Sequence, residues 1–214
     1  MKRPSADRRD RQRADLTRLA TGIIEEDGLA GLQARRLAER AGCAVGTVYN
    51  LFADLDGVIF AANEESLREI DAACRDALAA VGGESGATGR LLALAHAYAR
   101  YAIAHPKRFD ALFTHRAPAE RALPESFAEL TRSLFGLLGS VFSDAVAGMP
   151  DNERGLAARA LWASAHGVVM LGLQDRGGLL AREEARRRTE RAADRQSRRK
   201  RVDRADPRSY SAAS

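Results

Sequence analysis

The sequence lacks the residues that mark secreted, metal-binding and membrane proteins. Its two cysteines, Cys43 and Cys74, are too few and too far apart for a disulfide framework or a zinc site. Charges begin at Lys2, so the N-terminus has no apolar signal-peptide core. No run of about 18 apolar residues without a charge occurs, so a transmembrane span is not expected. These absences predict a reduced, cytoplasmic compartment and no membrane partner.

Aromatic residues are also scarce, at 6% of the 214 residues, although 45% of the chain is hydrophobic. Alanine, leucine and arginine carry most of the pattern, and these residues favour helix over strand. We therefore expect an all-α protein that is long enough to bury a real core. Catalytic signatures such as G-x-S-x-G, a P-loop or H-E-x-x-H are missing as well. No enzyme, no cofactor and no metal site are expected.

Basic charge is concentrated at the two ends of the chain. Residues 1–13 carry a net charge of +4 and residues 181–214 carry +6, so the segment between them is net negative in a chain of +5 overall. Basic ends suit arms that touch a polyanion, and they suit equally well solvated tails that keep the protein soluble. In the C-terminal segment Val202 is the one aliphatic residue larger than alanine, which predicts disorder.

Apolar residues recur with helical spacing along most of the remaining sequence. In residues 9–26, leucines, alanines and isoleucines stand at i, i+3, i+4, i+7 and i+8, which is typical of a helix packed on one side. Asp54 is the expected N-cap of the fourth helix. His105, which precedes a proline, is expected to end a helix, and His115 to be exposed in a loop. The predicted helices are 9–26, 33–42, 44–51, 54–81, 90–104, 106–113, 125–147 and 152–174.

One short stretch, AGCAVGTVYNLF at residues 41–52, has an unusual composition for a helix. Ala44 and Gly46 are small where a buried helix would carry larger residues, and Thr47 and Tyr49 add hydroxyl groups. A glycine turn precedes this stretch, so it reads as the second helix of a helix-turn-helix, the one that enters the major groove of DNA. A short exposed face allows close approach to DNA, and hydroxyls bind phosphate oxygens.

The other side chains of this helix divide between two faces. Val45 and Asn50 are free to meet base edges or thymine methyl groups. Val48, Leu51 and Phe52 are expected to point inward and hold the helix on the body of the protein. Short amphipathic helices around a glycine turn also occur in purely structural bundles, which is the competing interpretation.

The segment LQARRLAERAGCAVGTVYNLFADLDGVIFAA resembles the DNA-binding region of the TetR-type (tetracycline-repressor-like) transcriptional regulators, and the match covers residues 16–62. Its most specific part is the Gly-Thr-x-Tyr-x-x-Phe core. The resemblance implies phosphate contacts from Thr47 and Tyr49, and a base or phosphate contact from Arg35. Three departures from the family pattern matter. Gln33 stands at the usual Ser/Thr helix cap, which weakens both the capping of that helix and a phosphate contact. Cys43-Ala44 replaces the usual valine-serine, and Leu55 replaces a lysine that often touches phosphate.

The resemblance implies a homodimeric transcriptional regulator, a ligand-responsive repressor that binds a palindromic operator in double-stranded DNA and responds to an unknown small-molecule effector. The expected regions are a basic N-terminal arm (1–13), a three-helix helix-turn-helix domain (14–60), a larger helical ligand-binding and dimerisation domain (61–180) and a basic tail (181–214). Because no second apolar helix follows residue 180, we hypothesise a weakened dimer. The alternative is a small-molecule binding protein of the same fold that has lost DNA recognition, as the departures from the family pattern suggest.

The small-molecule site is expected among aromatic residues and their neighbours in the later helices: Tyr98, Phe113, Trp162, His166 and Met170. Trp162 and His166 are one helical turn apart. The segment LWASAHGVVMLGLQ that contains them resembles a Trp-His-Gly signature of one TetR-type subgroup. Ordinary core packing, with a hydrogen-bonded buried histidine, is the competing interpretation for each of these residues.

Overall fold

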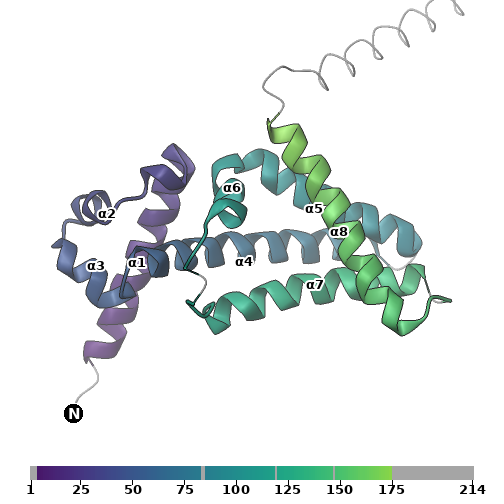
Figure 1. Ribbon diagram of the computed structural model, residues 1–214, viewed down its shortest axis with the longest axis horizontal. Helices are drawn as coiled ribbons and strands as arrows, with labels where there is room; N and C mark the ends of the chain where they lie inside the picture. Colours follow the sequence, from purple (N-terminus) through teal and green to yellow (C-terminus); the bar gives the residue numbers. More distant parts are fainter. Residues whose placement is uncertain (1–3, 83–84, 119, 147, 175–214) are drawn as a thin grey trace, which may run out of the picture. The chain divides into compact units, whose positions relative to one another are not determined.

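Figure 1 shows the computed structural model of the chain, which describes residues 4–82, 85–118, 120–146 and 148–174. Every regular element within these ranges is helical, so the predicted all-α class is confirmed. The elements are α1 (Pro4–Asp27), the 3-10 helix η1 (Leu29–Gly31), α2 (Ala34–Ala41), α3 (Val45–Phe52), α4 (Leu55–Val81), α5 (Gly86–Ala104), α6 (Pro106–Thr114), α7 (Glu125–Ala145) and α8 (Asp151–Gln174).

Contacts divide the chain into two units, Met1–Val169 and Met170–Ser214. The described part of the second unit is the end of α8, so the packing below belongs to the first unit. The predicted basic tail, 181–214, and its predicted disorder lie outside the described residues.

Helices α1, α2 and α3 surround one apolar core together with the start of α4. Its most deeply buried members come from the stripes that the sequence places inward: Leu16, Ile23, Ile24, Leu37, Val48 and Val58. Gly42 ends α2 in the left-handed conformation, with φ at 63°, which glycine adopts without a steric penalty. A three-helix helix-turn-helix therefore forms from local spacing and one glycine turn.

Helix α1 begins at Pro4, earlier than the predicted start at residue 9. Proline suits the first turn of a helix, since the N–H groups there have no partner within the helix. Most of the basic N-terminal segment, residues 1–13, therefore forms the first part of α1. Helix α5 likewise begins at Gly86, ahead of its predicted start at residue 90.

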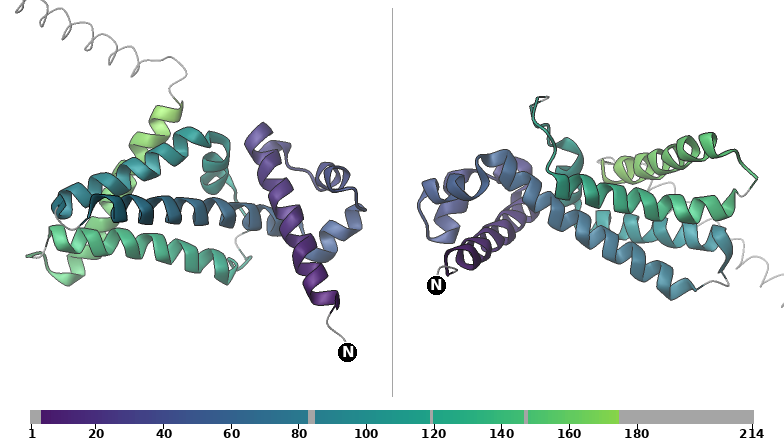
Figure 2. Two further views of the ribbon diagram at one scale, coloured as in Figure 1. Left: turned by 180° about the vertical axis from the view of Figure 1, so that it is seen from behind. Right: turned by 90° about the horizontal axis from the view of Figure 1, so that it is seen from below.

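Helix α4 connects the helix-turn-helix to the other helices. It packs against α1 and α3 and also against α5, α6 and α7 (Figure 2). Asp54 caps α4 as predicted, because its carboxylate accepts a hydrogen bond of 2.8 Å from the backbone N–H of Gly57. A β-carbon at Gly57 would lie 2.2 Å from the carbonyl oxygen of Phe52, so this glycine lets the end of α3 sit directly on the first turn of α4.

Helix α8 carries an unusual amount of exposed apolar surface. Leu156 and Val168 are 65% and 71% exposed. Among the described helices, the stretch Asn152–Leu173 is long and apolar enough to cross a membrane when judged by length and composition alone. An exposed apolar surface of this kind is also typical of an interface between proteins.

Candidate DNA-binding surface and ligand cavity

The outward face of α3 collects the residues that the sequence singles out for DNA contact. Ala44 forms the N-cap in an extended conformation. The exposed members are Ala44, Val45, Gly46, Tyr49 and Asn50, and Thr47 is half-buried. Tyr49 is 46% exposed, so its phenol is available to a partner. Val48 and Phe52 are buried on the opposite face, as predicted, and Leu51 is half-buried.

Gly46 has no structural reason to be glycine within the described chain. A β-carbon placed there would meet no described heavy atom within 4 Å, and the residue is the second of α3. Glycine loses more backbone freedom on folding than any other residue. The packing of the described residues therefore does not account for the cost of a glycine at this position.

Two arginines of α1 hold the C-terminal end of α3. Arg9 donates a hydrogen bond of 2.8 Å to the carbonyl oxygen of Asn50, and Arg13 donates one to the carbonyl oxygen of Leu51. The Arg13 guanidinium carbon also lies 4.2 Å from the centre of the Phe52 ring. Cations are favourable at this end of a helix, since the last carbonyl groups carry partial negative charge. Part of the N-terminal basic charge is thus engaged within the protein.

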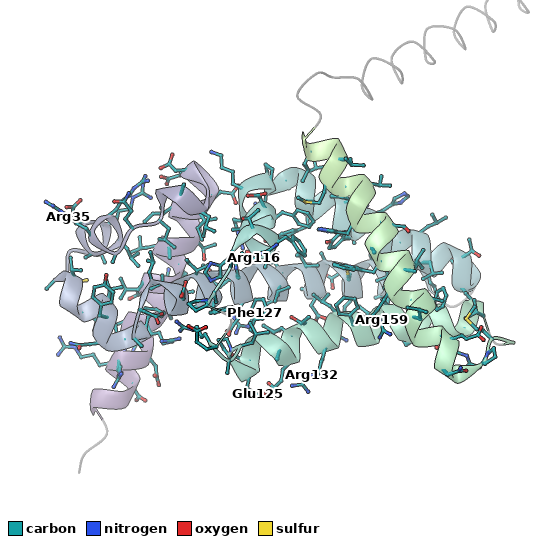
Figure 3. All side chains as sticks on the ribbon, viewed as in Figure 1. Arg35, Arg116, Glu125, Phe127, Arg132 and Arg159 are labelled. Carbon is teal, nitrogen blue, oxygen red and sulfur yellow. The ribbon has the colours of Figure 1, made fainter. Side chains whose placement is uncertain are left out.

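Arg35 lies exposed in the first turn of α2 and points away from the helices around it (Figure 3). Its Nε is 3.1 Å from Oε1 of Glu39, one turn further on. Exposed pairs of this type are worth about 0.3–0.5 kcal/mol, so Arg35 can exchange Glu39 for another anion at little cost. The start of α2 is weakly capped, as predicted, because the side chain of Gln33 makes no cap hydrogen bond within the described chain.

A cavity of about 440 Å³ lies among α4, α5, α6, α7 and α8. This volume is within the range of about 300–1,000 Å³ that small-molecule sites occupy. Leucine and aromatic side chains make most of its wall, and three of the predicted pocket residues, Tyr98, Phe113 and Trp162, are among them. The polar residues of the wall are Cys74, Thr88, Tyr98 and Thr131.

His166 lies beside the lining residues and contacts three of them. Its ring stacks on Trp162, with 5.0 Å between centroids and 10° between planes, and its centroid is 4.2 Å from that of Phe113. The hydroxyl oxygen of Tyr98 is 2.9 Å from Nδ1 of His166. The structure thus brings four of the five predicted residues together. Met170, the fifth, is half-buried in the second unit and is not among the lining residues.

Burial keeps the polar groups of this region neutral at physiological pH. It raises the pKa of the Cys74 thiol to about 11 and raises the pKa of Tyr98 beyond its ordinary range. It also lowers the pKa of His166, so its imidazole is uncharged near pH 7. The Tyr98 hydroxyl and Nδ1 of the neutral imidazole share a hydrogen bond, and the tautomer of the imidazole sets its direction.

A series of contacts leads from the cavity wall to the start of α4. Phe127 of α7 lines the cavity and meets Phe60 of α4 edge-on, with 5.5 Å between ring centroids (Figure 3). The Arg121 guanidinium carbon is 5.7 Å from the centre of the Phe60 ring. Arg121 also forms ion pairs with Asp54 and, at 3.5 Å, with Asp56. Its hydrogen bond is the main reason that the pKa of Asp54 lies below the usual value.

His115 lies in a loop after α6, as predicted, but the prediction that it is exposed is wrong. Its side chain is 8% exposed and its Nε2 lies 3.5 Å from Oδ1 of Asp56. Its ring meets Phe60 edge-on, with 5.3 Å between centroids. Burial is the main cause that lowers the pKa of this imidazole. His115 follows the last residue of α6, and its neighbours come from the first turns of α4, a helix much earlier in the sequence.

Helix α6 supplies a second connection between the cavity and the helix-turn-helix. Phe113 of α6 lines the cavity, whereas the start of α6 meets α1. There His105 Nδ1 lies 3.0 Å from the carboxylate of Glu25, and Lys107 donates a hydrogen bond to the carbonyl oxygen of Glu26. His105 ends α5 as predicted, and it also ties the following turn to α1.

These features define an all-helical, helix-turn-helix protein with an apolar cavity in its C-terminal helices. Residues 91–196 match the family model described as the tetracyclin repressor-like C-terminal domain. None of the curated proteins matches the sequence.

Three solved structures illustrate the likeness. A possible TetR family transcriptional regulator from Streptomyces coelicolor A3(2) is 21% identical with a TM-score of 0.57, covering 75% of this chain and 71% of that one. The transcriptional regulator FadR from Bacillus subtilis in complex with stearoyl-CoA is 14% identical with a TM-score of 0.60, covering 76% and 88%. BioQ with its natural double-stranded DNA operator is 21% identical with a TM-score of 0.54, covering 77% and 88%. The chain has the TetR fold, a helix-turn-helix followed by a helical C-terminal domain.

Proposed function

We propose that the chain is a TetR-family transcriptional regulator, a ligand-responsive repressor that binds a palindromic operator as a homodimer. The observation that carries this proposal is the outward face of α3. That face combines small residues and hydroxyl groups with Gly46, a glycine that the described chain does not need. Glycine at this position would allow a phosphate backbone or base edge to lie against α3, because any side chain there would hold the helix away from DNA.

In this proposal each exposed residue has a stated partner. The hydroxyls of Thr47 and Tyr49 donate to phosphate oxygens and set the register of the helix on the duplex. Val45 and Asn50 meet base edges or thymine methyl groups, and Ala44 keeps the helix start close to the groove. Arg35 binds a base or a phosphate after leaving Glu39. The likeness in fold to BioQ, which is solved with its operator, supports this assignment.

Dimerisation is assigned to α8, whose exposed apolar surface requires a partner. In a dimer on DNA, the two copies of α3 would lie about 34–36 Å apart, one turn of the double helix, and would read a palindrome. We also propose that the C-terminal domain belongs to the Trp-His-Gly subgroup, which the stacked pair of Trp162 and His166 supports.

The cavity is assigned to the effector, and its binding would release DNA by favouring a different spacing of the two copies of α3. The likeness in fold to FadR, solved with stearoyl-CoA, supports a small-molecule site in the C-terminal helices. A tenfold loss of DNA affinity requires a coupling free energy of about 1.4 kcal/mol between the two sites. No enzymatic activity is proposed, and no cofactor or metal is required for this function.

A selection of bound fragments from a random DNA pool tests the function. The wild type is expected to enrich a palindromic sequence whose affinity falls steeply with salt, because several phosphates are contacted. Thr47→Ala and Tyr49→Phe should each weaken every selected sequence several-fold, since each loses a hydrogen bond worth about 1 kcal/mol. Thr114→Ala, a matched change at an exposed threonine of α6, should leave affinity unchanged.

The alternative is a small-molecule binding protein of this fold that has lost DNA recognition. Gln33, without its cap bond, and the acidic start of α4 at Asp54 and Asp56, where Leu55 stands in place of a lysine, favour it over other classes. Such a protein would enrich no sequence above the starting pool and would show no salt-dependent affinity for DNA. Either result would replace the regulator by this alternative.

A further inference from the structure

The chemistry of the cavity wall limits the ligands that it can hold. Of the residues that the structure describes, those that line the cavity include no Asp, Glu, Lys, Arg or His. The wall is built from leucines of α4, α5, α6, α7 and α8 and from aromatic rings that include Phe113, Phe127 and Trp162. A ligand in the cavity is therefore surrounded by hydrocarbon and by ring faces and edges.

The polar groups of the wall have little capacity for a charged ligand. The Thr131 hydroxyl donates to the carbonyl oxygen of Phe127 at 2.9 Å, so its oxygen remains as an acceptor. The Tyr98 hydroxyl is engaged with His166 at 2.9 Å. The Cys74 thiol is held in its protonated form by burial, which raises its pKa to about 11. Thr88 is exposed at the start of α5 and offers one further hydroxyl.

We propose that the cavity binds a neutral, mainly hydrocarbon ligand with at most one or two hydrogen-bonding groups, and that it discriminates against carboxylates, amines and coenzyme A thioesters. A buried ion needs a counter-charge or several hydrogen bonds, and this wall supplies neither. A neutral hydrocarbon needs neither and gains from leaving water. The inference rests on the proposed function in one respect, that the occupant of the cavity is the effector.

Matched probes of equal chain length test the charge preference in the full-length protein. Trp162 is the single tryptophan of the sequence and lines the cavity, so its fluorescence reports binding without a label. The probes are 1-dodecanol, laurate, dodecylamine and lauroyl-CoA at pH 7, each below the concentration at which it aggregates. Dodecanol is expected to bind, and each charged probe is expected to bind at least about tenfold more weakly. Equal binding of laurate and dodecanol, or no binding of dodecanol, would overturn the proposal.

A matched pair of variants on α8 locates the binding site. Ala165 lines the cavity, whereas Ala163, two residues earlier, is exposed. Ala165→Phe fills part of the cavity and should abolish dodecanol binding, and Ala163→Phe should bind dodecanol as the wild type does. Loss of binding in both variants, or in neither, would show that dodecanol binds elsewhere, which contradicts the proposal.

A charge introduced into the wall should reverse the preference. Thr131→Arg places a guanidinium in the cavity, so laurate should bind more tightly than dodecanol. Thr131→Val keeps the shape without the hydroxyl and should retain the wild-type preference for dodecanol. Circular dichroism identifies a variant that does not fold, and in that case the ratio of wild-type affinities still decides the question.

The failure of this inference and the failure of the proposed function are distinguishable. The DNA selection needs no ligand, and the fluorescence titration needs no DNA. A palindromic site without preference for dodecanol would leave a regulator with a different class of effector. Preference for dodecanol without any selected DNA sequence would leave the ligand class intact and remove the regulator.

Discussion

The contact between Arg13 and the end of α3 leads to a prediction about the stability of α3. Arg13→Ala removes a charged hydrogen bond to the Leu51 carbonyl and the contact with the face of Phe52. Hydrogen bonds to charged groups contribute about 1.5–3 kcal/mol, and solvent exposure of Arg13 places this one at the lower end. Because Arg13 is exposed, its guanidinium over the buried ring of Phe52 adds about 0.5–1 kcal/mol. Local opening of α3 should become easier by about 2 kcal/mol, or about 30-fold.

The assay is amide hydrogen exchange of the full-length protein, read on peptides that contain α3. Arg11→Ala is the matched control, because Arg11 is exposed on the same helix, carries the same charge and bonds to the backbone of Asp7 at 3.2 Å. The exchange of α3 should accelerate about 30-fold in Arg13→Ala and stay unchanged in Arg11→Ala. If α3 exchanges at the same rate in both variants, Arg13 does not stabilise α3 and the reasoning fails.

Three further predictions concern the junction with α4 and the dimer. Arg121→Ala should weaken the effect of dodecanol on operator affinity several-fold. Arg116→Ala removes the same charge from the same loop and should not weaken this effect. Equal effects of the two substitutions would exclude the contacts of Arg121 as the coupling route. Ionised Asp54 stabilises the fold above its usual pKa of 3.8, and this stability is lost as pH falls through its lowered pKa. Urea unfolding should therefore show that Asp54→Asn lowers the free energy of unfolding at pH 6 and lowers it less at pH 3. An equal loss at both pH values would contradict the argument. Sedimentation should reveal a dimer that dissociates at micromolar concentration and that Val168→Glu abolishes. A dimer that stays intact at these concentrations would refute the weakened-dimer hypothesis. A dimer that Val168→Glu does not disrupt would place the interface away from this part of α8.

The helices could be predicted from the sequence because their signals are local. Apolar spacing, Pro106 at a helix start, Gly42 at a helix end and the Asp54 cap each act within a few residues. Helix α3 and its buried face could be predicted for the same reason, since the inward residues Val48 and Phe52 follow one spacing rule.

Contacts between residues that are far apart in the sequence could not be predicted in this way. Arg121 and Asp54 are 67 residues apart, and Arg13 and Leu51 are 38 apart, so no periodicity links them. Three of the predicted pocket residues, Tyr98, Phe113 and Trp162, do line the cavity, but the sequence did not single out the other two aromatic residues of the wall, Phe127 and Phe135. Cys74 belongs to the apolar stripe of α4 and lines the cavity, and in a sequence such a stripe looks the same whether it faces a packed core or a cavity.

The close fit of Gly57 under the carbonyl of Phe52 has a mechanical consequence. With no room for a side chain between them, the end of α3 and the first turn of α4 cannot slide past one another. Helix α4 has 27 residues and is therefore about 40 Å long. A tilt of about 5° about its far end would shift α3 by about 3.5 Å, about the full spacing of 3.4 Å between successive base pairs. In the function proposed above, this geometry would act as a lever: an effector that moves the α4 wall of the cavity slightly would displace α3 from its register on DNA.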